Sequence, residues 1–145
     1  MIKVKWLGLN GRPNVPPLSR GYQDDAGIDL HACQGIRIPS MQFKDVPIGV
    51  AVQMPEEAWG MIVGRSSALR HRGIFVVQGI IDPGYRGELF AGCFNLSPRV
   101  VDIGPGDRVA QLILFANETR HHEVVWADEL APAERGLAGF GSTGR

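Results

Sequence analysis

The sequence predicts an all-β fold: a jelly-roll-like β-sandwich or barrel with one short helix and a flexible, glycine-rich C-terminal tail. Three observations predict it. Many short segments alternate apolar and polar side chains, as half-buried strands do. They are separated by turns rich in glycine and proline, of which the chain has 19 and 10. Only one segment has the residues of a helix, which disfavours helical and mixed folds.

Nine segments have the pattern of strands. In chain order they cover residues 2–9, 36–39, 46–54, 60–63, 74–77, 88–95, 100–103, 107–115 and 123–126. The predicted helix covers residues 66–72, where Ser66 can cap the first turn and Gly73 can end the last one.

Length and composition exclude several classes of protein. The 145 residues contain no linker or repeat, so we expect one domain over residues 1–145, mobile from 135 to 145. The 15 basic and 15 acidic residues cancel, which gives no overall field to attract nucleic acid or an anionic membrane. No apolar run reaches the ~20 residues of a membrane span, and no signal peptide is recognisable, so a cytoplasmic location is expected. Cys33 and Cys93 are too isolated for a disulfide framework or a zinc site.

The last ten residues, 136–145, cannot bury a core of their own. Their glycine amides, the hydroxyls of Ser142 and Thr143 and the neighbouring Arg135 suit a phosphate, and Phe140 offers a flat face to a base. The alternative is a disordered terminus, since glycine-rich chain ends are commonly mobile.

Three internal segments carry residues that a scaffold does not need. The first segment, residues 64–70, covers the start of the predicted helix. Its Arg65, Ser66 and Ser67 could bind an anion there, or Ser66 could simply cap the helix. The second segment, residues 79–88, is predicted to form a hairpin that has Asp82 and Tyr85 at its tip. An ionised carboxylate there could deprotonate a water, although Asp before Pro also forms turns.

The third segment, residues 104–114, is a turn that leads into a strongly apolar strand. Gln111 is its one amide, and a buried amide must find partners or cost roughly 1–3 kcal/mol. Asp107 and Arg108 are interpreted as a structural turn pair.

In this order the segments resemble the trimeric, all-β dUTP pyrophosphatases (dUTPases) over nearly the whole chain. Five short motifs carry the resemblance: residues 26–30 (AGIDL), 64–67 (GRSS), 79–88 (GIIDPGYRGE), 106–112 (GDRVAQL) and 135–144 (RGLAGFGSTG). It implies hydrolysis of dUTP to dUMP and pyrophosphate, which supplies dUMP and keeps uracil out of DNA. It also implies a homotrimer with shared active sites, closed by the glycine-rich tail.

The resemblance assigns roles to individual residues. Asp82 would be the general base that deprotonates the attacking water, and Gln111 would orient that water or the α-phosphate. The implied phosphate ligands are Arg65, Ser66, Ser67, Arg135, Ser142 and Thr143. Mg²⁺ is expected on the triphosphate, where Asp29 would meet it through water; alternatively, Asp29 pairs with backbone at its strand end.

Recognition of uracil and deoxyribose is expected from the hairpin and the tail. The implied contacts are Val76, Gly79, Ile80, Ile81, Tyr85, Phe90, Phe140 and Gly141. Tyr85 would exclude a 2′-hydroxyl, and Phe140 would stack on the base. Val76 replaces an asparagine usual in the family, so main chain or Gln78 would read the base. Gly64 replaces a usual proline and Ala138 a usual glycine.

Two alternatives remain beside this function. One is a dCTP deaminase of the same fold, which needs a carboxylate where this chain has Gly92. The other is a catalytically idle protein that binds dUTP and acts as a regulator.

Overall fold

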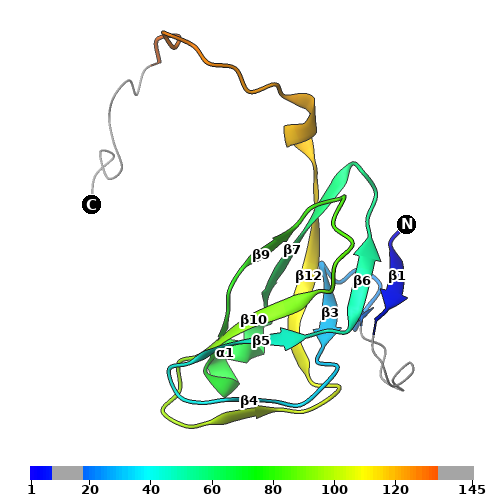
Figure 1. The fold of residues 1–145 in the computed structure, drawn as a ribbon, viewed down its shortest axis with the longest axis vertical. Coiled ribbons are helices and arrows are strands. Elements are labelled where there is room, and N and C mark those ends of the chain that lie inside the picture. The colour runs from blue at the N-terminus through cyan, green and yellow to red at the C-terminus, as the bar shows by residue number, and fades with distance from the viewer. Residues whose placement is uncertain (8–17, 134–145) are drawn as a thin grey trace.

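The computed structural model describes residues 1–7 and 18–133, and in these ranges it is built almost entirely of β-strands. Figure 1 shows two groups of strands that cross each other, with one short helix at the lower end of the strands and a short 3-10 helix beyond their upper end. The strands are β1 (Lys3–Trp6), β2 (Leu18–Ser19), β3 (Gly27–His31), β4 (Ile36–Ile38), β5 (Phe43–Pro47), β6 (Val50–Gln53), β7 (Ala58–Gly64), β8 (Ile74–Val76), β9 (Gly79–Ile81), β10 (Phe90–Asn95), β11 (Val101–Ile103) and β12 (Arg108–Ala116). The helices are α1 (Ser66–Arg72) and the 3-10 helix η1 (Glu118–His121).

The strands form two main sheets and two small ribbons. The larger sheet has the order β2-β3-β12-β7-β9, and the smaller has the order β5-β10-β8. The ribbons are β1-β6 and β11-β4. All of these pairs are antiparallel, and β5 and β10 run across the direction of β7 and β12 (Figure 1). This arrangement confirms the predicted jelly-roll-like β fold.

The core lies between the two main sheets. Leu30, Ile62 and Leu112 point inward from the larger sheet, and Ala91 and Cys93 point inward from β10 in the smaller one. Because side chains alternate along a strand, the residues between them face away from this core. On the larger sheet, the face turned away from the core carries the polar residues considered below.

Most predicted strands occur close to their expected positions, but residues 46–54 form two strands rather than one. The break lies at Gly49, whose φ of 75° is in the left-handed region that favours glycine. Gly49 lies between the two strands and, within the described ranges, makes no sheet hydrogen bond through its amide. That amide instead donates to a carboxylate oxygen of Glu88 over 3.0 Å.

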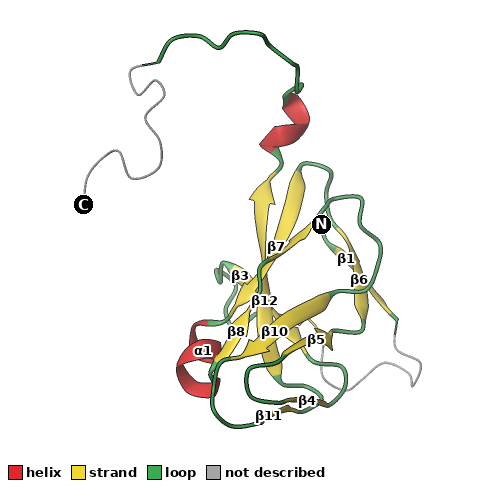
Figure 2. Cartoon of the chain, turned by 60° about the vertical axis from the view of Figure 1, so that its left-hand side comes forward, coloured by secondary structure: helices red, strands yellow, loops and turns green. Residues whose placement is uncertain are grey.

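Two other strand predictions were wrong. Residues 79–88 do not form a hairpin with the next strand, because β9 pairs with β7 in the larger sheet whereas β10 belongs to the smaller one. Residues 123–126 form no strand; the chain extends away from the β body after η1 (Figures 1 and 2), and Val124 and Trp126 are almost fully exposed. Strands β2, β3 and β9 lie outside the nine segments predicted as strands.

Helix α1 begins and ends by different means. Its N-cap is Arg65 in an extended conformation, and no side chain caps it, so the prediction that Ser66 is the cap was wrong. Its end confirms the expected role of Gly73, which has φ 67° and donates its amide to the Leu69 carbonyl over 3.0 Å. Arg72 then anchors the last turn through bonds to the Asp107 carboxylate and the Asp102 carbonyl.

Within residues 1–7 and 18–133, no helix has the length and apolarity needed to cross a membrane. The predicted mobile tail lies outside the described residues. Cys33 is half-buried and Cys93 fully buried, and both are free thiols.

Candidate active site

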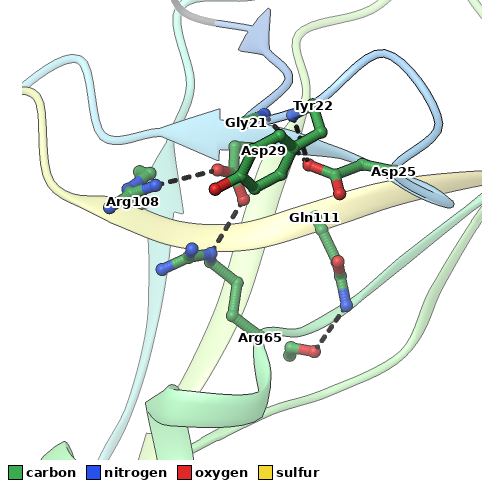
Figure 3. Close-up of polar contacts among 8 residues, drawn as sticks. Gly21, Tyr22, Asp25, Asp29, Arg65, Arg108 and Gln111 are labelled. Atoms are coloured by element: carbon green, nitrogen blue, oxygen red, sulfur yellow. Dashed lines mark hydrogen bonds and ion pairs between the residues drawn. The ribbon is translucent and has the colours of Figure 1, made fainter.

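A cluster of polar side chains lies on the face of the larger sheet opposite the core, where β3, β12 and β7 run side by side. Asp29 on β3 is the register partner of Gln111 on β12, which in turn is the register partner of Val63 on β7. The Asp29 side chain is 13% exposed and accepts a bond from Arg65 Nε over 2.8 Å. Its second oxygen lies 3.4 Å from Arg108 Nη1 (Figure 3). The Asp29 carboxylate therefore pairs with two arginine side chains. Within the described part of the chain, it does not make the bond to backbone that was the alternative prediction for this residue.

A β-bulge directs Arg108 into this cluster. Simple alternation would place Arg108 on the core side with Ala110 and Leu112. The β12–β3 register shifts between Arg108 and Ala110, so that Arg108 is opposite His31 while Ala110 is opposite Leu30. Since His31 and Asp29 share a face of β3, the bulge turns Arg108 toward Asp29. Sequence reasoning missed Arg108 because a bulge has no clear signature in an apolar strand.

Gln111 has a fixed orientation. Its Nε2 donates to the carbonyl of Gly64 over 3.2 Å (Figure 3), so the amide has the partner that the sequence analysis required. Gly64 is the last residue of β7 and Arg65 follows it directly. The end of β7 therefore orients the Gln111 amide and also places the Arg65 guanidinium beside it. Ser66 is exposed and Ser67 half-buried in the first turn of α1, adjacent to this end.

A cavity of about 260 Å³ adjoins the cluster on its β8 side. Arg65 and Val76 both line it, so the structure brings these two predicted residues together. Val76 is only 5% exposed, and Gln78 supplies a polar side chain to the same wall. The remaining lining residues are Val63, Gly64, Ala68, Leu69, Ile74 and Phe75.

The second group of predicted residues lies in the turn after β9. The Tyr85 amide donates to the Asp82 carbonyl over 3.0 Å, and the Tyr85 hydroxyl donates to the Glu88 carbonyl over 2.9 Å. The ring lies against Gly87, where a Cβ would overlap it. The turn thus holds Tyr85 in one place, while Asp82 keeps an exposed side chain.

The two groups stand far apart within one chain. Ile81, just before Asp82, pairs with Gly60, whereas Arg65 follows Gly64 on the same strand. Four residues along a strand span about 13 Å. In addition, Arg65 reaches toward β3, away from the β9 edge of the sheet.

Other predicted residues occupy separate places. Gly79, Ile80 and Ile81 form β9, and Ile80 is 69% exposed. Phe90 begins β10 in the smaller sheet and faces away from the core. Arg135, Phe140, Gly141, Ser142 and Thr143 lie outside the described residues.

The described part of the chain contains no group of three or more His, Cys, Asp or Glu side chains that could hold a metal ion. Both oxygens of Asp29 face arginines. Mg²⁺ usually keeps several waters and binds one or two carboxylates together with substrate phosphates. The cluster therefore fits an ion that arrives on a polyphosphate and contacts Asp29 through water, and it does not fit an ion caged by protein ligands alone.

Comparison with known proteins identifies the family of this chain. The dUTPase family model matches residues 14–144. The deoxyuridine 5'-triphosphate nucleotidohydrolase of Yarrowia lipolytica is 36% identical over 143 residues, covering 99% of this chain and 88% of the relative. That of Paramecium bursaria Chlorella virus 1 is 40% identical over 125 residues, covering 86% and 87%.

Solved structures share the fold. The Staphylococcus bacteriophage 80alpha dUTPase with dUPNHPP superposes with a TM-score of 0.87 at 25% identity, covering 100% of this chain and 99% of the other. The native dUTPase of EIAV has a TM-score of 0.70 at 26% identity, covering 90% and 100%. Because the family model spans most of the sequence and the curated relatives match nearly end to end, this chain belongs to the dUTPase family.

Proposed function

We propose that the protein hydrolyses dUTP to dUMP and pyrophosphate. The observation that carries the proposal is the cluster in which Asp29 orients Arg65 and Gly64 orients Gln111, in a chain whose curated relatives are deoxyuridine 5'-triphosphate nucleotidohydrolases. Arginine and a fixed amide at a helix start are suited to hold phosphate oxygens.

In the proposed reaction, water attacks the α-phosphorus in line with the departing pyrophosphate. Asp82 accepts the proton of that water, since its carboxylate is exposed and its turn is held by the Tyr85 amide. Gln111 orients the water or the α-phosphate, while Arg65, Ser66 and Ser67 bind phosphate oxygens. Catalysis of this kind depends mainly on positioning and on neutralising charge.

Residues of the tail complete the site. Arg135, Ser142 and Thr143 close on the γ-phosphate, and Phe140 stacks on the base beside Gly141. Removing residues 136–145 should therefore slow hydrolysis and leave the melting temperature unchanged, because the buried core of the described part of the chain is formed by residues between Leu30 and Leu112.

Uracil and deoxyribose are selected by the β8–β9 region and the following turn. Main-chain groups of Gly79, Ile80 and Ile81 read the base, and Gln78 replaces the amide that Val76 lacks. Tyr85, fixed over Gly87, leaves no room for a 2′-hydroxyl. Phe90 lines the same pocket from the start of β10.

The separation of the two residue groups supports a site shared between copies of the chain. Asp82 lies at the β9 edge and Arg65 reaches toward β3, so one phosphate cannot contact both in a single chain. We assign Asp82 and Arg65 of one site to different copies in a homotrimer, as the family resemblance implies. Light scattering on the purified protein measures the number of copies directly.

Mixing two inactive variants tests whether the site is shared. Arg65→Ala and Asp82→Asn should each be nearly inactive. When the two are unfolded and refolded together, some sites combine an intact Arg65 from one copy with an intact Asp82 from another, so part of the activity should return. Mixed trimers that stay inactive would contradict a shared site.

Mg²⁺ is the proposed metal. When bound to the triphosphate it lowers the negative charge that repels the attacking water. Asp29 would hold the ion through water, because both of its carboxylate oxygens already pair with Arg65 and Arg108.

The test of the function uses dUTP, dCTP and UTP with magnesium, following pyrophosphate and ammonia separately. Pyrophosphate from dUTP alone supports the proposal. Ammonia from dCTP would show a deaminase, and binding of dUTP without release of either product would show an idle regulator.

A further inference from the structure

We infer that Gly27 is a positioning residue for Gln111, an inference that rests on the proposed function. Gly27 begins β3 and lies on the same face as Asp29, beside the β12 strand that carries Gln111. The side chain of Gln111 crosses the position that a Cβ of residue 27 would occupy. A Cβ there would overlap Gln111 Oε1 and would stand 3.0 Å from Cδ and 3.2 Å from Cβ of the same side chain.

The backbone gives no other reason for glycine at this position. Among the described residues, the glycines with positive φ are Gly49, Gly73 and Gly106. Gly27 is therefore in a conformation that alanine adopts freely, and strands favour alanine over glycine. Gln111 supplies every atom that lies closest to the added Cβ. The missing side chain therefore makes room for one neighbour, the amide of Gln111.

That amide is also the group whose direction matters. Its Nε2 bonds to the Gly64 carbonyl over 3.2 Å, which aims the other atom, Oε1, across Gly27. An added methyl group would push Oε1 aside and rotate the amide away from Gly64. Because the end of a glutamine side chain is flexible, the fold can absorb this movement, and the loss should appear in catalysis rather than in stability.

Four proteins test the inference: wild type, Gly27→Ala, Gln111→Ala and the double variant. We expect Gly27→Ala and Gln111→Ala each to lower kcat by about tenfold or more, because misplacing one catalytic group has effects of this size. The double variant should be no slower than Gln111→Ala, since the added methyl then has no amide to displace. Binding of a nonhydrolysable dUTP analogue should change by less than about threefold in all of them.

Gly35→Ala is the matched control. An added Cβ at Gly35 would have its nearest neighbour, the Ile103 carbonyl oxygen, at 3.7 Å, and no residue of the cluster is among its neighbours. Its kcat should equal that of wild type. The melting temperatures of Gly27→Ala and wild type should agree within about 2 °C. If Gly27→Ala does not fold, the double variant should regain the fold, and failure to do so would overturn the inference.

The outcomes separate the inference from the function on which it rests. A Gln111→Ala variant with wild-type kcat would refute the catalytic role of Gln111 itself. A slow Gln111→Ala beside a fully active Gly27→Ala would refute the positioning role alone. Losses that multiply in the double variant would show that Gly27 acts through something other than Gln111 and would also overturn the inference.

Discussion

Asp29 holds Arg65 by its Nε at 2.8 Å, and this contact decides which part of the guanidinium is available to a ligand. Among the described residues, neither terminal amino group of Arg65 has a hydrogen-bond partner. The side chains are 13% and 26% exposed, so solvent screens the pair only in part. Asp29 therefore fixes the guanidinium through Nε and leaves the four N–H donors of the two terminal amino groups available to a ligand.

Replacing Asp29 by Asn should release Arg65 and leave Arg108 without its carboxylate. We expect kcat/KM for dUTP to fall by about tenfold or more, since an arginine that binds phosphate oxygens needs a fixed direction. The free energy of unfolding should fall by about 1–3 kcal/mol, as for a hydrogen bond between charged groups in a partly buried site. Steady-state kinetics and urea denaturation measure the two effects.

Asp102→Asn is the control for this variant. The Asp102 carboxylate pairs with Arg37 at 3.5 Å, and both side chains are mostly exposed. Such surface pairs contribute little, so activity and stability should match those of wild type. Equal kinetics for Asp29→Asn and Asp102→Asn would contradict the orienting role of Asp29.

Replacing Asp82, the proposed general base, should affect kcat but not substrate binding. Asp82→Asn preserves the turn, because the Tyr85 amide bonds to the Asp82 main-chain carbonyl rather than to its carboxylate. We expect binding of a nonhydrolysable dUTP analogue to persist while kcat falls by about a hundredfold or more, the range for loss of general base catalysis. Calorimetry and single-turnover kinetics separate the two quantities. An unchanged kcat would remove Asp82 from the base role.

The sequence predicted the strand content better than the strand pairing. The alternation in residues 107–115 and 88–95 gave β12 and β10 nearly at their true bounds. It could not show that β9 joins β7, because pairing between strands is decided by tertiary packing. Residues 123–126 failed for the same reason: their apolar side chains have the composition of a strand, but they pair with no other strand among the described residues.

Within the site, the motifs identified Asp29, Arg65 and Gln111 but not how they meet. Arg108 was interpreted as half of a structural turn pair with Asp107, and the bulge that turns it toward Asp29 became visible only in the structure. The role of Gly27 depends on the path of a side chain from another strand, which no local pattern encodes.

Asn95 is a fully buried amide on β10 that stabilises the loops around it. Its Nδ2 donates to the carbonyls of Ile38 and Arg99, and its Oδ1 accepts from the amide and the hydroxyl of Ser97. Asn95→Leu keeps the number and branching of the side-chain heavy atoms but is bulkier and leaves these groups unpaired, so unfolding free energy should fall by about 3 kcal/mol or more. Urea denaturation measures it, with exposed Gln53→Leu as the control. Equal midpoints for the two variants would contradict the prediction.

Cys93 should make the free energy of unfolding depend on pH in the alkaline range. Burial in the core, reinforced by nearby Asp45, raises the pKa of its thiol to about 12, whereas a cysteine in the unfolded chain titrates near 8.5. Between these values the unfolded state loses its thiol proton and the folded state keeps it, so stability is full below pH ~8.5 and falls as pH rises toward 12. The free energy of unfolding should therefore decline more steeply in wild type than in Cys93→Ala, by up to about 1.4 kcal/mol per pH unit. Urea denaturation at several pH values from 8 upward measures the free energy of unfolding of both proteins. The other titrating groups are the same in the two proteins, so any difference in slope comes from the Cys93 thiol. Parallel curves would show that this thiol ionises without unfolding.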